Sequence, residues 1–229
     1  MLELKLALAK DVPLRILCLG AHSDDIEIGC GGTILKLLSS NSAVNVHWVV
    51  LGAAGDREKE ARESAEWFLT GAMQKEIVVK GFRDGFFPYI GREIKEYFEE
   101  IKKQVSPDVI FTHFRHDLHQ DHRLVCELTS NTFRDHLILE YEVIKYDGDL
   151  GSPNLFVHLG DSHARTKVNH ILDVFKTQGS RSWFTEDAFM SIMRIRGLES
   201  NAPEKFAEAF YCRKLVLLES WRTRRKNSR

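Results

Sequence analysis

The stretch AHSDDIEIGCGGT at residues 21–33 places one histidine and two adjacent aspartates within four positions, at His22, Asp24 and Asp25. A short apolar run at residues 15–20 precedes it and is typical of a buried strand, and the apolar residues after it favour a helix. The three side chains are therefore expected in a strand-to-helix turn. Open α/β sheets bind their ligands at this end of their parallel strands.

Two neighbouring carboxylates in such a turn repel each other, and partial burial strengthens the repulsion. A bound cation is the simplest relief, with one carboxylate as a ligand and the other as a base. The alternative is a helix cap, since aspartate is a favoured capping residue. A cap explains neither His22 nor the second cluster of histidines described below, so we favour a metal site.

The chain has 229 residues and a formal net charge of −1, which fits one large α/β domain and argues against a general polyanion-binding surface such as one for nucleic acid. We expect a single domain over residues 1–229, with a core at about 12–135, a C-terminal portion at about 140–220 and a basic tail at 222–229. No run is long and apolar enough to span a membrane, and residues 1–10 lack the features of a signal peptide.

The four cysteines are scattered, and three of them lie in or beside apolar segments, as buried free thiols do. We therefore expect no disulfide bonds and a location in the reducing cytoplasm.

Strand-like and helix-like segments alternate through the first 132 residues. Strands are predicted at 14–20, 44–51, 76–79 and 109–112, and helices at 29–39, from 56 to about 68, at 90–105 and at 121–132, with Asn41 and Ser42 ending the first helix. This alternation predicts right-handed crossovers and a Rossmann-like, mostly parallel sheet with helices on both faces.

The pattern loosens after residue 133. Strands are predicted at 142–146 and 155–159, helices around 168–175 and 189–193, and residues 206–218 are ambiguous between helix and strand. The basic end of the chain, 222–229, is expected to be mobile. The fold class is therefore α/β with a smaller α+β C-terminal portion.

A second polar cluster, THFRHDLHQDH at residues 112–122, also follows a predicted strand. If the two strands are parallel, both clusters lie at the same edge of the sheet. Zinc binds imidazole nitrogen and carboxylate oxygen, and a catalytic zinc site keeps one position for water. Two histidines and one aspartate satisfy that requirement. His113 and His116 are expected to make hydrogen bonds in the core or a loop.

These two segments resemble the PIG-L/LmbE-like zinc-dependent de-N-acetylases, which remove acetyl groups from N-acetylglucosamine-type sugars. The first motif of that family, Ala-His-Pro-Asp-Asp-Glu before a glycine-rich helix start, is met at residues 21–33, and its second motif, His-x-Asp-His, at 119–122. The resemblance extends to SPNLFV, to Arg196-Gly197 and to FAEAF near the C-terminus, so it covers nearly the whole chain.

The resemblance implies roles for five side chains. His22, Asp25 and His122 are similar to the zinc ligands, and Asp24 is similar to the general base. His119 is similar to the group that stabilises the oxyanion or protonates the leaving amine.

The resemblance also suggests substrate contacts, on a weaker alignment. Arg62 and Asp84 are similar to substrate-contacting positions, although Asp84 also fits a turn before Gly85. Arg196, Arg181 and Glu208 are expected either to line the pocket from the C-terminal portion, or to be solvated or form interdomain pairs.

Two positions depart from the family motif. Ser23 replaces the usual proline, which frees the backbone of the turn, and Ile26 replaces the usual glutamate, although Glu27 follows it. Neither change removes a ligand.

We therefore expect a zinc-dependent hydrolase that removes the N-acetyl group from an N-acetylated amino sugar or its glycoside or conjugate. The expected substrate is a small molecule, and we expect neither a membrane span nor a nucleic-acid partner.

Two alternatives stay open. One is a non-catalytic nucleotide- or sugar-binding α/β module, although the glycines at 29–32 lack the G-x-G-x-x-G spacing of dinucleotide-binding turns. The other is a zinc amidase that acts on a non-sugar amide. Assembly into a homo-oligomer is a further expectation from the family resemblance.

Overall fold

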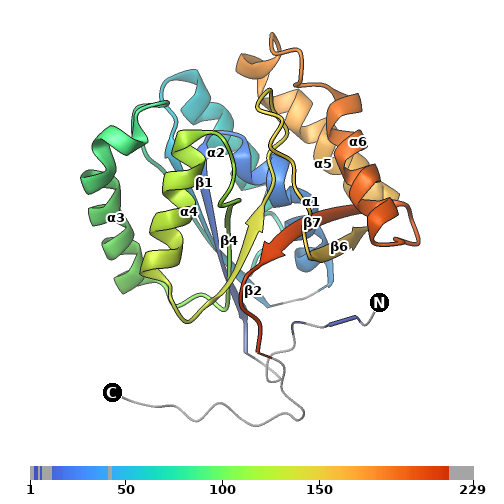
Figure 1. Ribbon diagram of the computed structural model, residues 1–229, viewed down its shortest axis with the longest axis horizontal. Coiled ribbons are helices and arrows are strands. Elements are labelled where there is room, and N and C mark those ends of the chain that lie inside the picture. The colour runs from blue at the N-terminus through green and yellow to red at the C-terminus, as the bar shows by residue number, and fades with distance from the viewer. Residues whose placement is uncertain (1–2, 5, 7–11, 41–42, 217–229) are drawn as a thin grey trace.

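The computed structural model describes residues 3–4, 6, 12–40 and 43–216 (Figure 1). Within these residues one sheet of seven strands forms the centre of the molecule, in the order β3-β2-β1-β4-β5-β7-β6. The strands are β1 (Leu14–His22), β2 (Val44–Gly52), β3 (Gln74–Val79), β4 (Val109–His113), β5 (Leu137–Tyr141), β6 (Leu155–Leu159) and β7 (Phe206–Cys212). The helices are α1 (Asp25–Ser40), α2 (Asp56–Phe68), α3 (Gly91–Gln104), α4 (Gln120–Thr132), α5 (Asp161–Val174) and α6 (Glu186–Glu199), with 3₁₀ turns at Phe87–Ile90 and Lys176–Gln178.

The order of the strands explains where a ligand can bind. Strands β1 to β5 pair in parallel, whereas β7 is antiparallel to both β5 and β6. The chain moves outward from β1 to β3 on one side and then returns to place β4 on the other side of β1. The loops after β1 and β4 therefore leave the sheet in a crevice at a topological switch point, which is the usual ligand site of such sheets.

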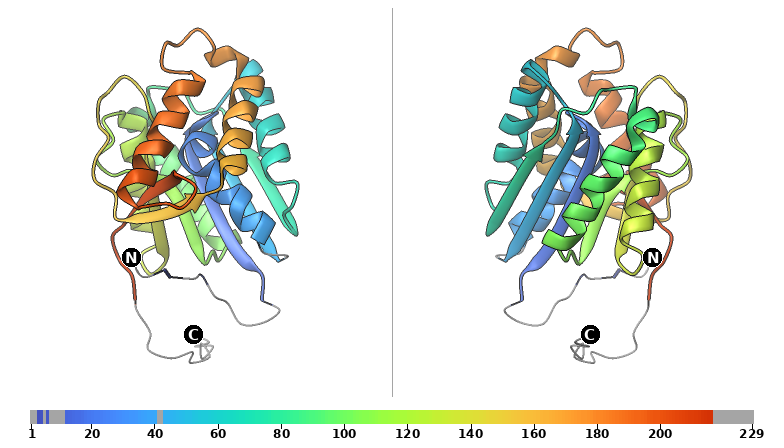
Figure 2. Two further views of the ribbon diagram at one scale, coloured as in Figure 1. Left: turned by 90° about the vertical axis from the view of Figure 1, so that its right-hand side faces the viewer. Right: turned by 90° about the vertical axis from the view of Figure 1, so that its left-hand side faces the viewer.

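Alternate residues of β1 face two separate apolar layers. Ile16 and Cys18 belong to a cluster that also contains buried residues of α1, α2, α5 and α6. Leu17 and Leu19 belong to a second cluster formed with α3 and α4. Figures 1 and 2 show the sheet between these two layers of helices. The predicted mostly parallel sheet, with helices on both faces and a smaller α+β C-terminal portion, is confirmed.

The first predicted helix begins earlier than expected. We placed its start at Gly29, but α1 begins at Asp25, directly after the polar turn. The turn is therefore only two residues long, and the carboxylate of Asp25 lies in the first turn of the helix. The predicted end of this helix, at Asn41 and Ser42, lies outside the described residues.

The strand predicted at 142–146 is wrong. Strand β5 covers Leu137–Tyr141 instead, and residues 142–146 form a loop. Strand β5 pairs with β4 and with β7 only as far as Tyr141, so both of its hydrogen-bonded ladders end at that residue. The ambiguous segment from residue 206 is a strand as far as Cys212. Its last residues, 217–218, and the basic tail at 222–229 lie outside the described residues.

Close packing explains the glycines at the start of α1. A Cβ atom on Gly29 would lie 2.1 Å from Cδ2 of Tyr141, and one on Gly32 would lie 2.6 Å from Cδ1 of Leu159. The helix therefore rests directly on β5 and β6. This close approach fixes the position of the turn that precedes the helix.

A buried ion pair joins the C-terminal portion to α1. The Glu208 carboxylate accepts hydrogen bonds from the backbone N–H groups of Gly32 and Thr33, at 2.8 and 2.6 Å. The Lys167 ammonium donates to Glu208 at 2.6 Å and to the Ile28 carbonyl at 2.7 Å. Glu208 is therefore paired and buried rather than solvated, and a role of Glu208 in the pocket stays a prediction.

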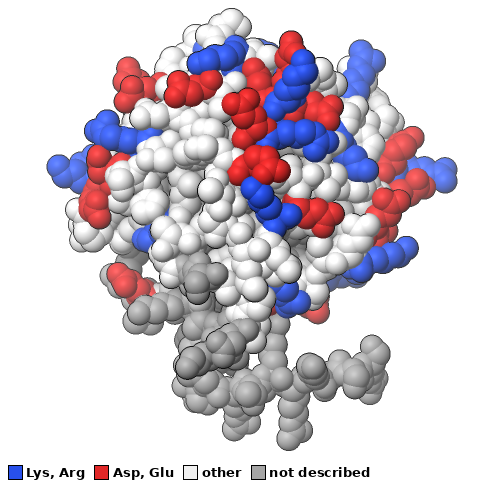
Figure 3. Space-filling view, turned by 180° about the vertical axis from the view of Figure 1, so that it is seen from behind, with Lys and Arg blue, Asp and Glu red and all other residues white. Residues whose placement is uncertain are grey.

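Three further features of the described residues concern surface charge, the cysteines and the length of the helices. On the face shown in Figure 3, acidic and basic side chains are interspersed. The cysteines, at positions 18, 30, 126 and 212, are all free thiols. Among the residues that the structure describes, we find no helix with the length and apolar character that spanning a bilayer requires.

The replacement Gly29→Ala tests the packing of α1 on β5. The added methyl group meets the buried Tyr141 ring, so the free energy of unfolding should fall by about 1–3 kcal/mol, the usual cost of overpacking. Gly91→Ala is the matched control, because a Cβ atom there lies 3.8 Å from the nearest atom of Leu124. Denaturant unfolding measures both variants. Equal stability of Gly29→Ala and the unmodified protein would contradict this view of the packing.

Candidate metal centre

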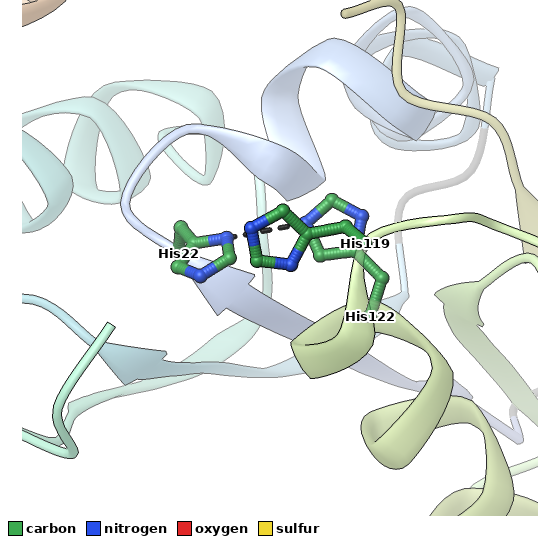
Figure 4. Close-up of side chains that lie close together, drawn as sticks. All are labelled: His22, His119 and His122. Atoms are coloured by element: carbon green, nitrogen blue, oxygen red, sulfur yellow. Dashed lines mark hydrogen bonds between the residues drawn. The ribbon is translucent and has the colours of Figure 1, made fainter. Parts of the chain in front are cut away.

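The two polar clusters meet at the carboxyl ends of β1 and β4. His22 is the last residue of β1, and Asp25 is the first residue of α1. His119 is the N-cap of α4, and His122 lies in the first turn of that helix. Figure 4 shows the three histidine rings converging from these two segments.

Three buried side chains place their donor atoms around one point. His22 Nδ1 lies 3.1 Å from His122 Nε2. The Asp25 carboxylate spans the two nitrogens, with Oδ2 at 3.3 Å from His22 Nδ1 and Oδ1 at 3.4 Å from His122 Nε2. Donors bound tetrahedrally to zinc at about 2.0–2.1 Å lie about 3.3 Å from one another. The donor set and its spacing therefore fit a divalent ion such as Zn²⁺.

Other groups of side chains nearby are also close enough to share an ion. Within the described residues, His22 lies near His119 and His122, and it also lies near Asp84 and Asp121. A further group joins Asp25 and His122 to the histidine at position 113. These groups share residues and form one polar centre, but Asp84 and Asp121 meet His22 at Nε2, on the opposite side of the ring from Asp25 and His122.

Neighbouring carboxylates orient both histidine rings. His122 Nδ1 lies 2.9 Å from Asp117 Oδ2, and His22 Nε2 lies 3.2 Å from Asp121 Oδ2. With the ring protons assigned to these nitrogens, the other nitrogen of each ring carries a free lone pair toward the shared point. The backbone N–H of His22 donates to Asp25 Oδ2 at 2.6 Å and holds that carboxylate in place.

The electrostatics of the centre suit a cation. Burial and the adjacent His113 lower the pKa of His122 to about 3, so its imidazole is neutral. Burial alone would raise the pKa of Asp25, but the three surrounding histidines lower it well below its ordinary value. Burial alone would lower the pKa of His22. The neighbouring carboxylates outweigh this effect, Asp25 most strongly, and raise the pKa of His22 well above its ordinary value. The anionic surroundings of His22 would equally favour a metal ion.

Asp24 differs from Asp25 in its surroundings. It is buried, and burial together with the adjacent charge of Asp25 raises the pKa of Asp24 to about 7. A carboxyl group whose pKa lies near neutrality can both accept and release a proton, as a general base requires.

His119 is held in one tautomer by its position at the helix end. Its Nδ1 accepts a hydrogen bond from the backbone N–H of Asp121 at 3.3 Å, which leaves the proton on Nε2. Burial and the nearby His22 lower the pKa of His119, which favours the neutral ring. The ring meets that of His22 edge-on, with 4.8 Å between the centroids.

His113 and His116 have different surroundings. His113 is fully buried, and its Nε2 accepts a hydrogen bond from the backbone N–H of Ala21 at 2.9 Å, which confirms the expected core role. The same nitrogen lies 3.3 Å from Asp25 Oδ2, so this ring also belongs to the polar centre. His116 is exposed and packs edge-on against Phe114.

Asp84 reaches the edge of the centre. Its Oδ1 lies 3.1 Å from His22 Nε2, and its Oδ2 accepts a hydrogen bond from Arg57 at 2.9 Å. The side chain is about half exposed, and Gly85 after it has a φ of +78°, so the turn that we considered is also present. A substrate contact by Asp84 stays a prediction.

The other two predicted substrate contacts lie in different surroundings. Arg62 pairs with Glu58 on the exposed face of α2, at 3.0 Å. Arg196 is buried, and its guanidinium donates to Glu142 and Glu199 at 2.8–3.0 Å. These ion pairs account for both guanidinium groups, and contact of either with a substrate stays a prediction.

Three residues of the centre received no role in the sequence analysis: Arg57, Asp117, and Asp121, which orients His22 from within the second motif. Arg57 follows β2 at the same sheet edge, bonds to Asp84 and lowers the pKa of Asp24 against the effect of burial. Asp117 lies two residues before His119 and orients His122. Arg57 follows a predicted strand, and Asp117 lies inside the second cluster. These positions were signals that could have identified both residues.

The departures from the family motif are accommodated in the core. Ile26 is fully buried and packs against Gly20. Ser23 and Glu27 are also fully buried, and burial raises the pKa of Glu27 to about 8, so it is largely protonated at neutral pH.

Comparison with known proteins identifies the family. The family model described as PIG-L, GlcNAc-PI de-N-acetylase, matches residues 17–133, which is just over half of the chain and includes both polar clusters. The chain belongs to the PIG-L family.

A curated relative supports this membership. The chain is 30% identical over 120 residues to the uncharacterized deacetylase YaiS of Escherichia coli K12. That match covers 48% of this chain and 63% of the relative, so less than two thirds of the relative is represented.

Solved structures share the fold. N,N'-diacetylchitobiose deacetylase of Pyrococcus horikoshii is 22% identical with a TM-score of 0.66, over 86% of this chain and 83% of that one. The conserved protein TT1542 of Thermus thermophilus is 18% identical with a TM-score of 0.71, over 92% and 99%. GalB of Pseudomonas putida KT2440, a 4-carboxy-2-hydroxymuconate hydratase, is 16% identical with a TM-score of 0.70, over 91% and 100%. Because these neighbours include a hydratase, the fold alone does not decide the reaction.

The replacement His122→Ala tests the donor set. It removes one of three donors, so stoichiometric zinc binding should be lost, while His116→Ala should bind zinc as the unmodified protein does. Elemental analysis after zinc loading and desalting measures the metal content of each. Full zinc content in folded His122→Ala would place the ion elsewhere.

Proposed function

We propose that this PIG-L family member is a zinc-dependent hydrolase that removes the N-acetyl group from an N-acetylated amino sugar or its glycoside or conjugate. The observation that carries the proposal is the spacing of 3.1–3.4 Å among the donor atoms of His22, Asp25 and His122. These three residues would hold the metal. When bound, zinc would act as a Lewis acid and would lower the pKa of a water molecule bound to it toward neutrality.

Asp24 is the proposed general base. Its carboxylate accepts a proton from the attacking water as the water oxygen forms a bond with the acetamide carbonyl carbon. The pKa of about 7 makes the deprotonated form available near neutral pH. After the proton has been taken, the same carboxyl group can deliver it to the nitrogen as the C–N bond breaks, which yields acetate and a free amine.

His119 is the proposed donor to the developing oxyanion. Its Nδ1 accepts the backbone N–H of Asp121, so the ring presents Nε2–H as a donor. A well-placed donor of this kind lowers the barrier by about 3–4 kcal/mol. The neutral tautomer supports hydrogen bonding to the oxyanion as the proposed role of His119, with protonation of the amine as the proposed second role of Asp24.

The replacement Asp24→Asn separates catalysis from metal binding. It removes the base but none of the three ligands, so zinc content should be retained while turnover falls by about 10²–10⁴-fold. Amine release and elemental analysis on the same preparation measure both quantities. Metal-free Asp24→Asn protein would show that Asp24 serves the metal instead.

A substrate screen tests the reaction class. Zinc-loaded protein is incubated with N-acetylglucosamine, its glycosides, its nucleotide sugars and a set of N-acetylated non-sugar amines, and free amine is measured. Amine release from one of the sugar classes supports the proposal. Cleavage of non-sugar amides alone would instead identify a zinc amidase, and bound zinc without turnover of any compound would identify a binding module.

Two further proposals concern the setting of the protein. The free cysteines are consistent with a location in the reducing cytoplasm. Assembly into a homo-oligomer rests on the family resemblance alone.

A further inference from the structure

One buried carboxylate joins the two histidines of the second cluster. Asp117 Oδ1 accepts a hydrogen bond from the backbone N–H of His119 at 2.7 Å, and Oδ2 lies 2.9 Å from His122 Nδ1. The Asp117 side chain is 2% exposed. Because it bonds to both ends of the His119–His122 turn, its orientation sets the direction in which His122 points.

A lysine from the C-terminal portion holds that carboxylate. Lys145 lies in the loop after β5, and its side chain is 9% exposed. Its ammonium donates to Asp117 Oδ2 at 3.0 Å and to Asp149 Oδ2 at 2.6 Å. Asp149 in turn accepts a hydrogen bond from the backbone N–H of Leu118 at 2.7 Å. Lys145 and Asp149 together therefore clamp the loop that precedes α4.

The buried charge of Asp117 explains why Lys145 is needed beside it. A buried carboxylate is costly unless a charge and hydrogen bonds compensate for it. The Asp117 carboxylate meets the neutral His122 ring, the backbone N–H of His119 and Lys145, and the carboxylates of Asp147 and Asp149 also lie close to it. Lys145 therefore supplies the cation for a group of three carboxylates. Without it, Asp117 would gain by turning toward solvent and would release His122 Nδ1.

We propose that Lys145 is a positioning residue for metal binding, which acts through Asp117 to hold His122 in the orientation that directs Nε2 at the shared point. The proposal rests on the zinc site proposed above. Lys145 lies outside the segment 17–133 that matches the family model. The three proposed ligands all lie inside that segment, so the C-terminal portion contributes to the metal affinity without supplying a ligand.

The test compares four variants of the full chain: Lys145→Met, Asp117→Asn, the double variant and Lys36→Met. Lys36 is the matched control. Its ammonium also joins the N-terminal region to the C-terminal portion, because it donates to the His158 carbonyl at 2.6 Å. It is not one of the groups that hold Asp117. Competition with a chromophoric chelator gives the zinc affinity. Unfolding curves establish that each variant is folded.

We expect Lys145→Met and Asp117→Asn each to weaken zinc binding by about 10–100-fold, the usual effect of removing an outer partner of a metal ligand. Lys145 and Asp117 are proposed to act on His122 through the same contacts. The zinc affinity of the double variant should therefore equal, within about twofold, that of the single variant that binds zinc less tightly. The visible spectrum of the Co²⁺-loaded protein should change in the Lys145→Met variant, because the orientation of a ligand changes. Lys36→Met should keep both affinity and spectrum.

Unchanged zinc affinity in folded Lys145→Met would overturn the proposal, as would losses that multiply in the double variant. If Lys145→Met does not fold, Lys145→Gln, which keeps a donor but removes the charge, takes its place with the same expectations. Absence of zinc binding by the unmodified protein would contradict the proposed function itself, so the two failures are distinguishable.

Discussion

The approach of His22 to His122 is the contact on which the structure of the centre depends. These residues are 100 positions apart in the chain, yet their ring nitrogens lie 3.1 Å from each other. Parallel pairing of β1 with β4 brings the two loops to one edge of the sheet. The close contact of α1 with β5, made through Gly29, then fixes the turn that carries Asp25.

Buried charge is the second constraint. Asp25, Asp117 and Asp121 are almost fully buried, and each lies beside a histidine of the centre. Such a concentration of carboxylates and imidazoles is costly unless hydrogen bonds and opposite charges balance it. Backbone N–H groups of Gly85 and Phe87 satisfy Asp121, and Lys145 compensates for Asp117. Asp25 faces the shared point between the two imidazoles, which is where a cation would complete the balance.

Most of the fold could be predicted from the sequence because its signals are local. The apolar runs that became β1, β2 and β4, and the amphipathic segment that became α3, were identified with shifts of a few residues at their ends. The strand placed at 142–146 was wrong because β5 ends at Tyr141, where its pairing with β4 and β7 ends, and no local sequence pattern marks that point. The same difference between local sequence signals and long-range contacts applies to the candidate site. The two motifs indicated which histidines and aspartates meet, whereas the partners of Arg57, Arg196 and Lys145 depend on contacts between distant segments that no local pattern contains.

The most direct measurement is the position of the metal in a crystal of the zinc-loaded protein, from anomalous scattering at the zinc edge. The account predicts one strong peak within bonding distance of His22 Nδ1, Asp25 and His122 Nε2, beside the carboxylate of Asp24. A peak on the other side of the His22 ring, between Nε2, Asp84 and Asp121, or no peak in the centre at all, would contradict it.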